Sequence, residues 1–133
     1  MKTLWRVAVV IAWLALPAAC QPPADARQAI VGDWDVEMEP GVLAERITFD
    51  IDDHNRLRLL AADMPAGMVQ YFELQPSAEG EFRGTYIVLQ NDIEVRRFGL
   101  VVNLSDDGQR LKLTLIRTGA GGERTIDLVR HRP

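Results

Sequence analysis

Residues 32–41 read GDWDVEMEPG, and in this stretch large apolar side chains alternate with acidic ones. Every second residue from Trp34 to Met38 is apolar, and each of these is flanked by aspartate or glutamate. Because successive side chains of a β-strand point to opposite faces of a sheet, the alternation predicts a strand with one buried and one solvated face. Pro40 and Gly41 follow it and favour a tight turn. We therefore expect a strand that ends in a hairpin.

The same alternation recurs in separate runs as far as residue 130, and no helical period persists anywhere between them. Turn-forming residues separate the runs at seven places, which are 39–41, 52–55, 64–67, 76–80, 91–92, 105–108 and 119–122. Seven turns between consecutive runs predict eight strands joined as hairpins. A meander of that size can remove its two exposed edges by closing on itself. The sequence therefore predicts an all-β fold, an antiparallel up-and-down barrel of about eight strands.

One predicted strand changes its alternation at Arg96 and Arg97. Ile93 and Val95 lie on one face of this strand, whereas the apolar residues from Phe98 onward lie on the other. Such a change is typical of a β-bulge, which re-aims the side chains of a strand. The arginine pair has two interpretations: a group at the barrel rim that meets an anion, or a bend with two solvated side chains.

The first nineteen residues have the order of a secretory signal peptide. Lys2 and Arg6 form a short basic start, and the apolar run at 7–16 is too short for a spanning helix of ~20 residues. Small residues then lead to Cys20, which is the only cysteine of the chain. Two alternatives remain: an uncleaved membrane anchor, or cleavage near Ala26 at an A-x-A site that would release a soluble periplasmic protein.

The residues LPAA at 16–19, followed by Cys20, resemble the lipobox of bacterial lipoproteins, in which the cysteine receives a diacylglyceryl group. This resemblance implies a lipidated Cys20 as the mature N-terminus. The next residue is glutamine rather than aspartate, which by likeness to sorted lipoproteins implies a cell-envelope protein of the outer membrane facing the periplasm. The expected organisation is a signal peptide at 1–19, a lipid-anchored tether at 20–29 and one domain at 30–133.

Gly32-Asp33-Trp34 opens the domain, and Arg130 and Arg132 lie at its end. These residues resemble the lipocalin pattern, in which a G-x-W motif puts a tryptophan at the closed end of the barrel. In that family an arginine from beyond the last strand lies across the tryptophan ring, a cation–π contact. The resemblance implies a lipocalin-like small barrel, with structural roles for Gly32, Trp34 and either Arg130 or Arg132.

Charge and cysteine content restrict the classes of partner. Without Lys2 and Arg6, 13 basic residues face 19 acidic ones, so the exported chain has a net charge of −6. Phosphate binding needs clustered positive charge, and we therefore expect no nucleic-acid partner. With Cys20 as the sole cysteine, the domain has no intramolecular disulfide and must be held together by its core.

Side chains suited to catalysis are sparse and scattered in the predicted domain. Its serines, Ser77 and Ser105, fall in predicted turns, and its histidines are His54 in a turn and His131 near the C-terminus. The acidic cluster at 50–55 lacks the glycine and the terminal glutamate of a calcium loop. We therefore expect a protein that is not an enzyme and holds no metal or cofactor. Hydrolysis by a pair of carboxylates is the catalytic alternative that remains.

The predicted barrel interior is the first candidate binding surface. Its inward positions supply the candidate ligand-binding residues, which are Trp34, Met38, Phe49, Met68, Gln70, Phe72, Phe82 and Tyr86. Gln70 and Tyr86 would orient the ligand, because binding pockets are largely apolar with a few polar groups. Two interpretations remain open: a hollow barrel that binds a small apolar or amphiphilic ligand, or a barrel filled by these side chains.

The opposite face of the strands is the second candidate surface. Several apolar residues point outward on the same alternation, namely Tyr71, Ile87, Leu89, Val101, Ile116 and Val129. Grouped apolar residues on a wet face are typical of a protein contact, although scattered ones are normal. This face, or the loops at 64–67 and 119–122, would serve the alternative function, a protein-binding module that acts as an envelope enzyme inhibitor or adaptor.

Overall fold

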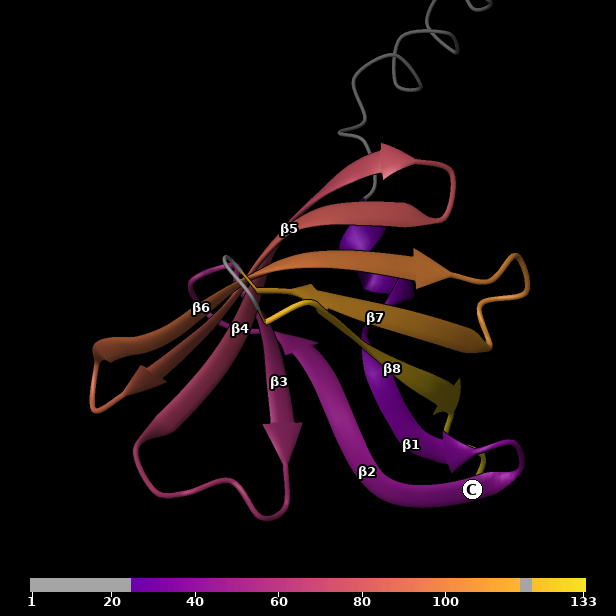
Figure 1. The fold of residues 1–133 in the computed structure, drawn as a ribbon, viewed down its shortest axis with the longest axis horizontal. Coiled ribbons are helices and arrows are strands. Elements are labelled where there is room, and N and C mark those ends of the chain that lie inside the picture. Colours follow the sequence, from indigo (N-terminus) through magenta and orange to yellow (C-terminus); the bar gives the residue numbers. More distant parts are fainter. Residues whose placement is uncertain (1–24, 118–120) are drawn as a thin grey trace, which may run out of the picture.

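The computed structural model describes residues 25–117 and 121–133. They form a closed barrel of antiparallel strands in chain order, preceded by one short 3-10 helix (Figure 1). The elements are η1 (Ala26–Ala29), β1 (Gly32–Glu39), β2 (Val42–Ile51), β3 (Leu57–Ala61), β4 (Met68–Ala78), β5 (Glu81–Gln90), β6 (Ile93–Leu104), β7 (Arg110–Ile116) and β8 (Glu123–Arg130). The pairing of β8 with β1 closes the barrel. The predicted eight-stranded up-and-down barrel is thus confirmed.

The predicted signal peptide, Cys20 and the rest of the tether as far as residue 24 lie outside the described residues. In the part of the chain that the structure describes, no helix is long and apolar enough to span a membrane.

Short turns with left-handed backbone connect several of the strands. Asn91 (φ 51°) and Asp92 (φ 67°) form the two-residue connection between β5 and β6. A positive φ at both central residues matches the twist of the flanking strands, and Asn and Asp reach this region more readily than most other residues. Between β1 and β2 only Gly41 (φ 79°) has a positive φ, because the ring of Pro40 fixes its φ at a negative value. At both places the turn-forming residues of the sequence mark the strand connection.

One turn is shorter than expected. The stretch 76–80 was predicted as a turn, but β4 continues through Pro76, which pairs with Phe82 of β5. A register shift follows between Pro76 and Ala78. Proline lacks a backbone N–H and is tolerated in a strand where the ladder is irregular, which explains the extension.

The core fills the closed end of the barrel, where β1 begins and where the β2–β3, β4–β5 and β6–β7 turns lie. Its buried side chains are Ile30, Trp34, Ile47, Phe49, Leu57, Phe72, Leu74, Phe82, Leu100, Val102, Leu111, Leu113 and Leu128. Residues nearer the open end, among them Leu59, Tyr86 and Leu115, are only partly buried. The barrel is therefore filled in one half and less densely occupied in the other.

Trp34 is the centre of the closed end. Its side chain is fully buried, and its indole N–H donates to the carbonyl oxygen of Ile30 at 2.9 Å. The guanidinium of Arg130 lies 4.0 Å from the ring centroid, a cation–π contact. Arg130, and not Arg132, therefore fills the position expected for an arginine across the tryptophan ring. Gly32 sits beside them at φ 131°, and a Cβ there would come within 2.9 Å of the Arg130 guanidinium.

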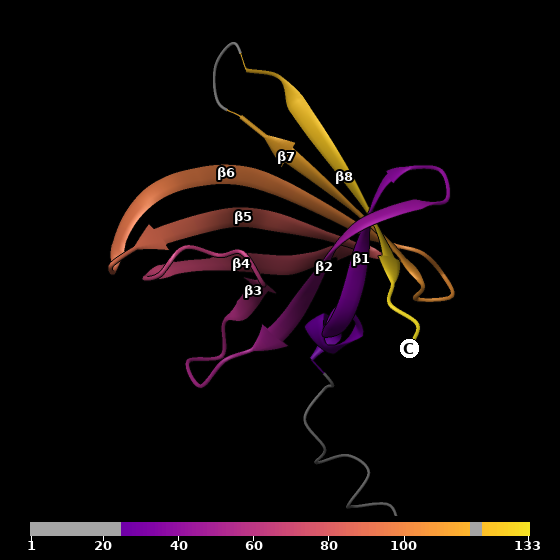
Figure 2. The ribbon, with the colours of Figure 1, turned by 90° about the horizontal axis from the view of Figure 1, so that it is seen from below.

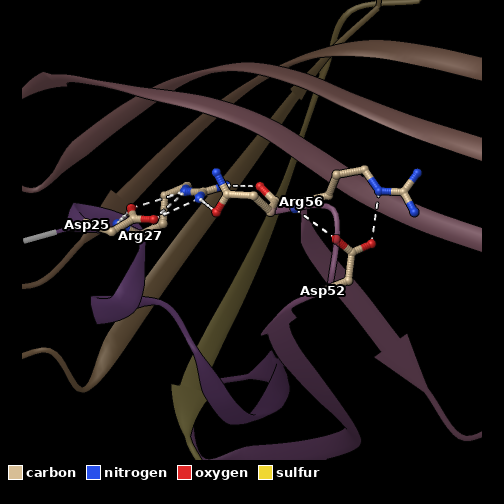
Figure 3. A network of polar contacts seen from close by, with 5 residues as sticks. Asp25, Arg27, Asp52 and Arg56 are labelled. Carbon is tan, nitrogen blue, oxygen red and sulfur yellow. Dashed lines mark hydrogen bonds and ion pairs between the residues drawn. The ribbon is translucent and has the colours of Figure 1, made fainter.

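The short helix η1 is fixed to the barrel by polar contacts (Figure 3). Asp25 caps it by accepting from the backbone N–H of Arg27. The Arg27 guanidinium forms an ion pair with Asp25 at 2.7 Å and donates to the carbonyl oxygen of Asn55 at 2.9 Å. Asn55 lies in the β2–β3 turn, where Arg56 pairs with Asp52. The expected tether therefore ends in a segment that is bound to the closed end.

Two irregularities bend the strands near the open end. Val88 pairs with Arg96 and Leu89 with Glu94, so Val95 is an extra residue in β6. This confirms the β-bulge predicted at the change of alternation. The β1–β2 ladder shifts twice beyond Asp35. In both views the β1–β2 tip lies on the opposite side of the molecule from the β5–β6 turn, and Figure 2 shows β4, β5 and β6 side by side as long, curved strands.

Candidate functional site

Three adjoining hollows occupy the open half of the barrel. One of about 530 Å³ is bounded mainly by β1, β2, β3, β7 and β8 and is also lined by Gln70 and Phe72 of β4 and Tyr86 of β5. One of about 400 Å³ is bounded by β4, β5 and β6, and one of about 460 Å³ by β5 to β8. Tyr86 lines all three. We call the three hollows together the Tyr86 cavity. Its walls are largely apolar, with Val36, Leu59, Phe72, Val88, Phe98, Leu113, Leu115 and Ile126 among the lining residues.

A hydrogen-bonded pair lies at the centre of this cavity. The Tyr86 hydroxyl donates to the side-chain oxygen of Gln70 on the neighbouring strand. The Gln70 amide in turn lies 3.2 Å from the sulfur of Met64. Burial raises the pKa of Tyr86 above its ordinary value, against a smaller opposing effect of Arg96. The phenol is therefore neutral at physiological pH and remains a hydrogen-bond donor.

Aromatic rings continue from the core into the cavity. Phe49 packs on Phe72, and Phe72 packs edge-on against Tyr86, with both pairs of centroids 5.3 Å apart. Tyr86 then stacks on Phe98 at 5.9 Å. Arg117 completes the series, with its guanidinium 5.6 Å from the centre of the Phe98 ring. This row links the filled half of the barrel to the rim and offers aromatic surface to a ligand.

The rim is basic on one side and acidic on the other. Arg96, Arg117 and Arg124 line the hollow bounded by β5 to β8. The hollow bounded by β1, β2, β3, β7 and β8 is lined by Glu37, Glu45 and Asp127 together with Arg124. Glu37 is engaged by Arg110 at 3.3 Å. The arrangement can hold an apolar group and present it with charges of opposite sign at two sides, but it brings no nucleophile and base together.

Four of the predicted ligand-binding residues line the Tyr86 cavity: Met68, Gln70, Phe72 and Tyr86. Sequence reasoning also proposed Tyr86 and Gln70 as the polar groups, and the structure brings these two side chains together.

The other four predicted ligand-binding residues do not lie in the cavity interior. Trp34, Phe49 and Phe82 are buried core residues of the closed end, and none of them lines the three hollows. Met38 was expected inside, yet its side chain is 68% exposed. The register shifts beyond Asp35 end the alternation of β1 there, and Met38 stands at the rim, where it borders the largest hollow.

The outward face differs from expectation at Ile87. This residue was predicted to be accessible, but its side chain is fully buried. Its direct partners on the neighbouring strands are Tyr71 and Arg97, whose long side chains can cover it. Arg56 in turn lies 5.0 Å from the centre of the Tyr71 ring. Ile87 is therefore not available at the surface, whereas Tyr71, Leu89, Val101 and Val129 are partly exposed.

The exposed apolar residues lie instead around the open end. They are Met38, Val42 and Leu43 at the tip of the β1–β2 hairpin, Ile93 and Val95 after the β5–β6 turn, and Ile116 at the end of β7. Of the two loops named with the alternative function, 64–67 lies within the described residues, whereas 119–122 lies only partly within them.

The residues considered for catalysis remain scattered, with one exception. His131, near the C-terminus, lies with its Nδ1 2.9 Å from Asp35 on the outside of the barrel, and the pair is partly buried. His54 is exposed in the β2–β3 turn, as expected. The oxygen cluster at 50–55 is engaged by arginines: Arg58 pairs with Asp50 and Arg56 with Asp52.

Arg117 and Arg124 were missed as site residues in the sequence. Arg124 could have been found, because it continues the inward alternation of Ile126 and Leu128. Arg117 lies just beyond β7, where no alternation applies, and only the contact with Phe98 reveals its position.

Comparisons of the chain with known protein families, with curated proteins and with solved structures found no match.

Proposed function

We propose that this domain binds a small apolar or amphiphilic ligand in the Tyr86 cavity and that it does so without catalysis. The observation that carries the proposal is the hollowed open half of the barrel, which has largely apolar walls, the Gln70–Tyr86 pair at its centre and charged side chains at its rim. Binding pockets of this composition hold a ligand by apolar contact and orient it by sparse hydrogen bonds. Gln70, Tyr86 and Phe72 are the central contacts in this proposal.

The cellular setting is part of the same proposal. The signal-like residues 1–19 and the lipobox-like residues before Cys20 support export and lipidation, with the outer membrane as the anchor site and the periplasm as the surroundings. Several acyl chains on one cysteine hold a protein to a membrane almost permanently, since each buried methylene adds ~0.8 kcal/mol. The function is therefore ligand binding by an envelope lipoprotein with a lipocalin-like barrel.

Native mass spectrometry tests the proposal. The chain is produced with its own signal, purified from the envelope and measured before and after denaturation. We expect a mass increment that disappears on denaturation, and uptake of the neutral apolar probe N-phenyl-1-naphthylamine by the emptied protein. A bare mass together with no enhancement of probe fluorescence would contradict the proposal.

Ala61→Trp provides the cavity-blocking variant for this test. Ala61 borders the largest hollow, and a large ring there should occupy the ligand space and reduce probe uptake. Ala44→Trp is the matched control, because Ala44 is exposed and lies on the outside of the barrel. Phe82 and Gly84 are unsuitable as blocking sites. Phe82 is a core residue, and a Cβ on Gly84 would stand 1.7 Å from the carbonyl oxygen of Glu73.

A protein-binding module is the second candidate function, and the exposed apolar tip of the β1–β2 hairpin favours it. Met38, Val42 and Leu43 are each at least half exposed, and apolar tips of this kind suit a protein contact. In that case Leu43→Asp should abolish cross-linking to an envelope protein while leaving uptake of the naphthylamine probe unchanged. Unaltered cross-linking would remove the tip from consideration.

A further inference from the structure

Half of the arginines of the described residues are neutralised by a carboxylate. Ion pairs of 3.3 Å or less engage Arg27, Arg56, Arg58, Arg83, Arg97 and Arg110. The arginines that form no ion pair with a described residue are Arg46, Arg96, Arg117, Arg124, Arg130 and Arg132. Their positions show where positive charge is left without an acidic partner.

Three of the unpaired arginines gather in one hollow. Arg96, Arg117 and Arg124 form no ion pair and donate no side-chain hydrogen bond to any residue within 25–117 or 121–133. They line the hollow of about 460 Å³ bounded by β5 to β8, and no aspartate or glutamate lines it. Like charges held close to one another repel, and an anion placed among them removes the repulsion. The hollow thus has the charge of an anion site.

The surroundings of the three arginines are apolar. Arg117 covers the Phe98 ring, Phe98 stacks on Tyr86, and Leu115 and Ile126 complete the wall. Tyr86 connects this hollow to the larger one, whose walls include Phe72 and Leu113. An anion that carries an apolar chain would therefore find charge at the rim and apolar surface beneath it.

The acidic side of the rim gives the ligand a direction. Glu45 and Asp127 border the larger hollow on the side of β2 and β8. An anionic group is repelled there and attracted by the arginines, and complementary charges of this kind fix the register of a bound partner.

We infer that the Tyr86 cavity takes a single-chain amphiphile with an anionic headgroup, bound by Arg96, Arg117 and Arg124. This inference rests on the proposed function and adds the class of ligand to it. The apolar chain lies against Tyr86, Phe98 and the walls of the larger hollow. Arginine suits this role because its planar guanidinium donates two parallel hydrogen bonds to a carboxylate or phosphate.

Calorimetric titration of the processed protein, after any bound amphiphile has been removed, tests the inference. Decanoate and 1-decanol share the chain and differ in the charge of the headgroup, and acetate provides the charge without the chain. Charged hydrogen bonds of this kind correspond to about a tenfold gain in affinity or more, so decanoate should bind at least that much more tightly than 1-decanol. Acetate should not compete, and added salt should weaken decanoate binding alone.

The variant R96Q/R117Q/R124Q assigns the effect to these residues. It should lower decanoate affinity to that of 1-decanol and leave 1-decanol binding unchanged. Arg46→Gln is the matched control, because Arg46 is exposed, forms no ion pair with a described residue and borders a hollow outside the barrel. Circular dichroism shows whether the triple variant is folded, and the exposed position of all three arginines predicts that it is.

The outcomes separate the inference from the proposed function. Equal affinity for decanoate and 1-decanol overturns the inference while ligand binding stands. A preference for decanoate that survives in the triple variant overturns the assignment to these arginines. Competition by acetate would mean that the apolar chain is not needed, and it overturns the amphiphile as the class of ligand. If neither decyl compound binds, the inference fails, and uptake of the naphthylamine probe shows whether the proposed function fails with it.

Discussion

Arg130 serves two structural purposes with one guanidinium. It covers the Trp34 ring and donates to the carbonyl oxygens of Ala29, Val31 and Gly108. Burial lowers its pKa from the ordinary value, but arginine stays protonated in proteins. Three carbonyl groups from two segments therefore satisfy the charge, and one side chain of the last strand joins the start of the domain to the β6–β7 turn.

Replacing Arg130 by glutamine should lower the free energy of unfolding by about 2–3 kcal/mol, because hydrogen bonds from a charged donor and the contact with the Trp34 ring are lost. Urea unfolding followed by fluorescence measures the change, since Trp34 is the only tryptophan after residue 19. Arg132→Gln is the control and should stay within about 0.5 kcal/mol of the wild type. Equal stability of both variants would contradict this role of Arg130.

Individual residues show where prediction from sequence ends. The tryptophan–arginine contact could be predicted, but the choice between Arg130 and Arg132 depends on the pairing of β8 with β1. Met38 was misplaced because the alternation of β1 ends at a register shift that no residue type announces. Ile87 was misplaced because larger side chains on neighbouring strands cover the outward face there.

Among the elements, η1 is the one whose attachment to the barrel depends most on charged side chains. Its connection to the β2–β3 turn passes through Arg27, which contacts Asp25 on one side and Asn55 on the other (Figure 3). Hydrogen bonds from Arg27 hold the pKa of Asp25 below its ordinary value. A carboxyl group whose folded pKa is depressed stabilises the fold above its unfolded pKa, about 3.9, and this contribution disappears as pH falls through the folded pKa.

Asp25→Asn should therefore lower the thermal midpoint at pH 7 and have no effect once the pH is below the folded pKa. Asparagine still caps a helix, so the variant removes the charge and keeps the N-cap. Differential scanning calorimetry of both proteins between pH 7 and pH 2.5 measures the difference. Asp106→Asn removes the same charge from the exposed β6–β7 turn and should change the midpoint less. A difference that does not shrink as the pH falls below the unfolded pKa of about 3.9 would contradict the ion pair.

The strands themselves were the most predictable elements. Alternation identified each of them, and residues such as Asn91 and Asp92 marked the turns. The β-bulge in β6 could be predicted because the alternation of apolar and polar residues changes within the sequence of that strand. Pro76 was assigned to a turn from its residue type, whereas the tertiary pairing with Phe82 keeps it in β4.

For the molecule as a whole, the ladders around the barrel differ in length. β4 pairs with β5 from Met68 to Ala78, whereas β3 pairs with β4 only at Leu57, Arg58 and Leu59. The contact between β8 and β1 is also short and runs from Trp34 to Glu37. A closed barrel opens most readily where the fewest backbone hydrogen bonds hold neighbouring strands together.

Amide hydrogen exchange should reveal this difference. The central amides of β5 have a long ladder on each side, and they should exchange at rates set by global unfolding. Amides of β3 should exchange faster than those of β5, because local opening exposes them without global unfolding. The ratio of the two exchange rates under native conditions measures this difference. Mass spectrometry of peptic fragments measures both regions in the same sample. Equal protection of β3 and β5 would mean that the barrel opens only as a whole.

The barrel topology could be predicted from the sequence, but the hollow inside it could not. Strand number and turn spacing are encoded locally, so the meander and its closure follow from them. Whether eight strands enclose space depends on how side chains from distant strands meet. Phe72 of β4 and Tyr86 of β5, for example, line a hollow together with residues of β1, β2, β3, β7 and β8.

The position of η1 also determines how the domain would be oriented at a membrane. The chain enters the barrel at the closed end, and residues 21–24 span at most roughly 14 Å at ~3.5 Å per residue. A strand as long as β6 extends about 40 Å at ~3.3 Å per residue. If Cys20 carries the expected lipid, the segment between Cys20 and η1 is too short for the open end of the barrel to reach the leaflet in which that lipid is anchored. A ligand would then enter and leave the cavity through the aqueous space or a facing surface, and not through the lipids of the anchoring leaflet.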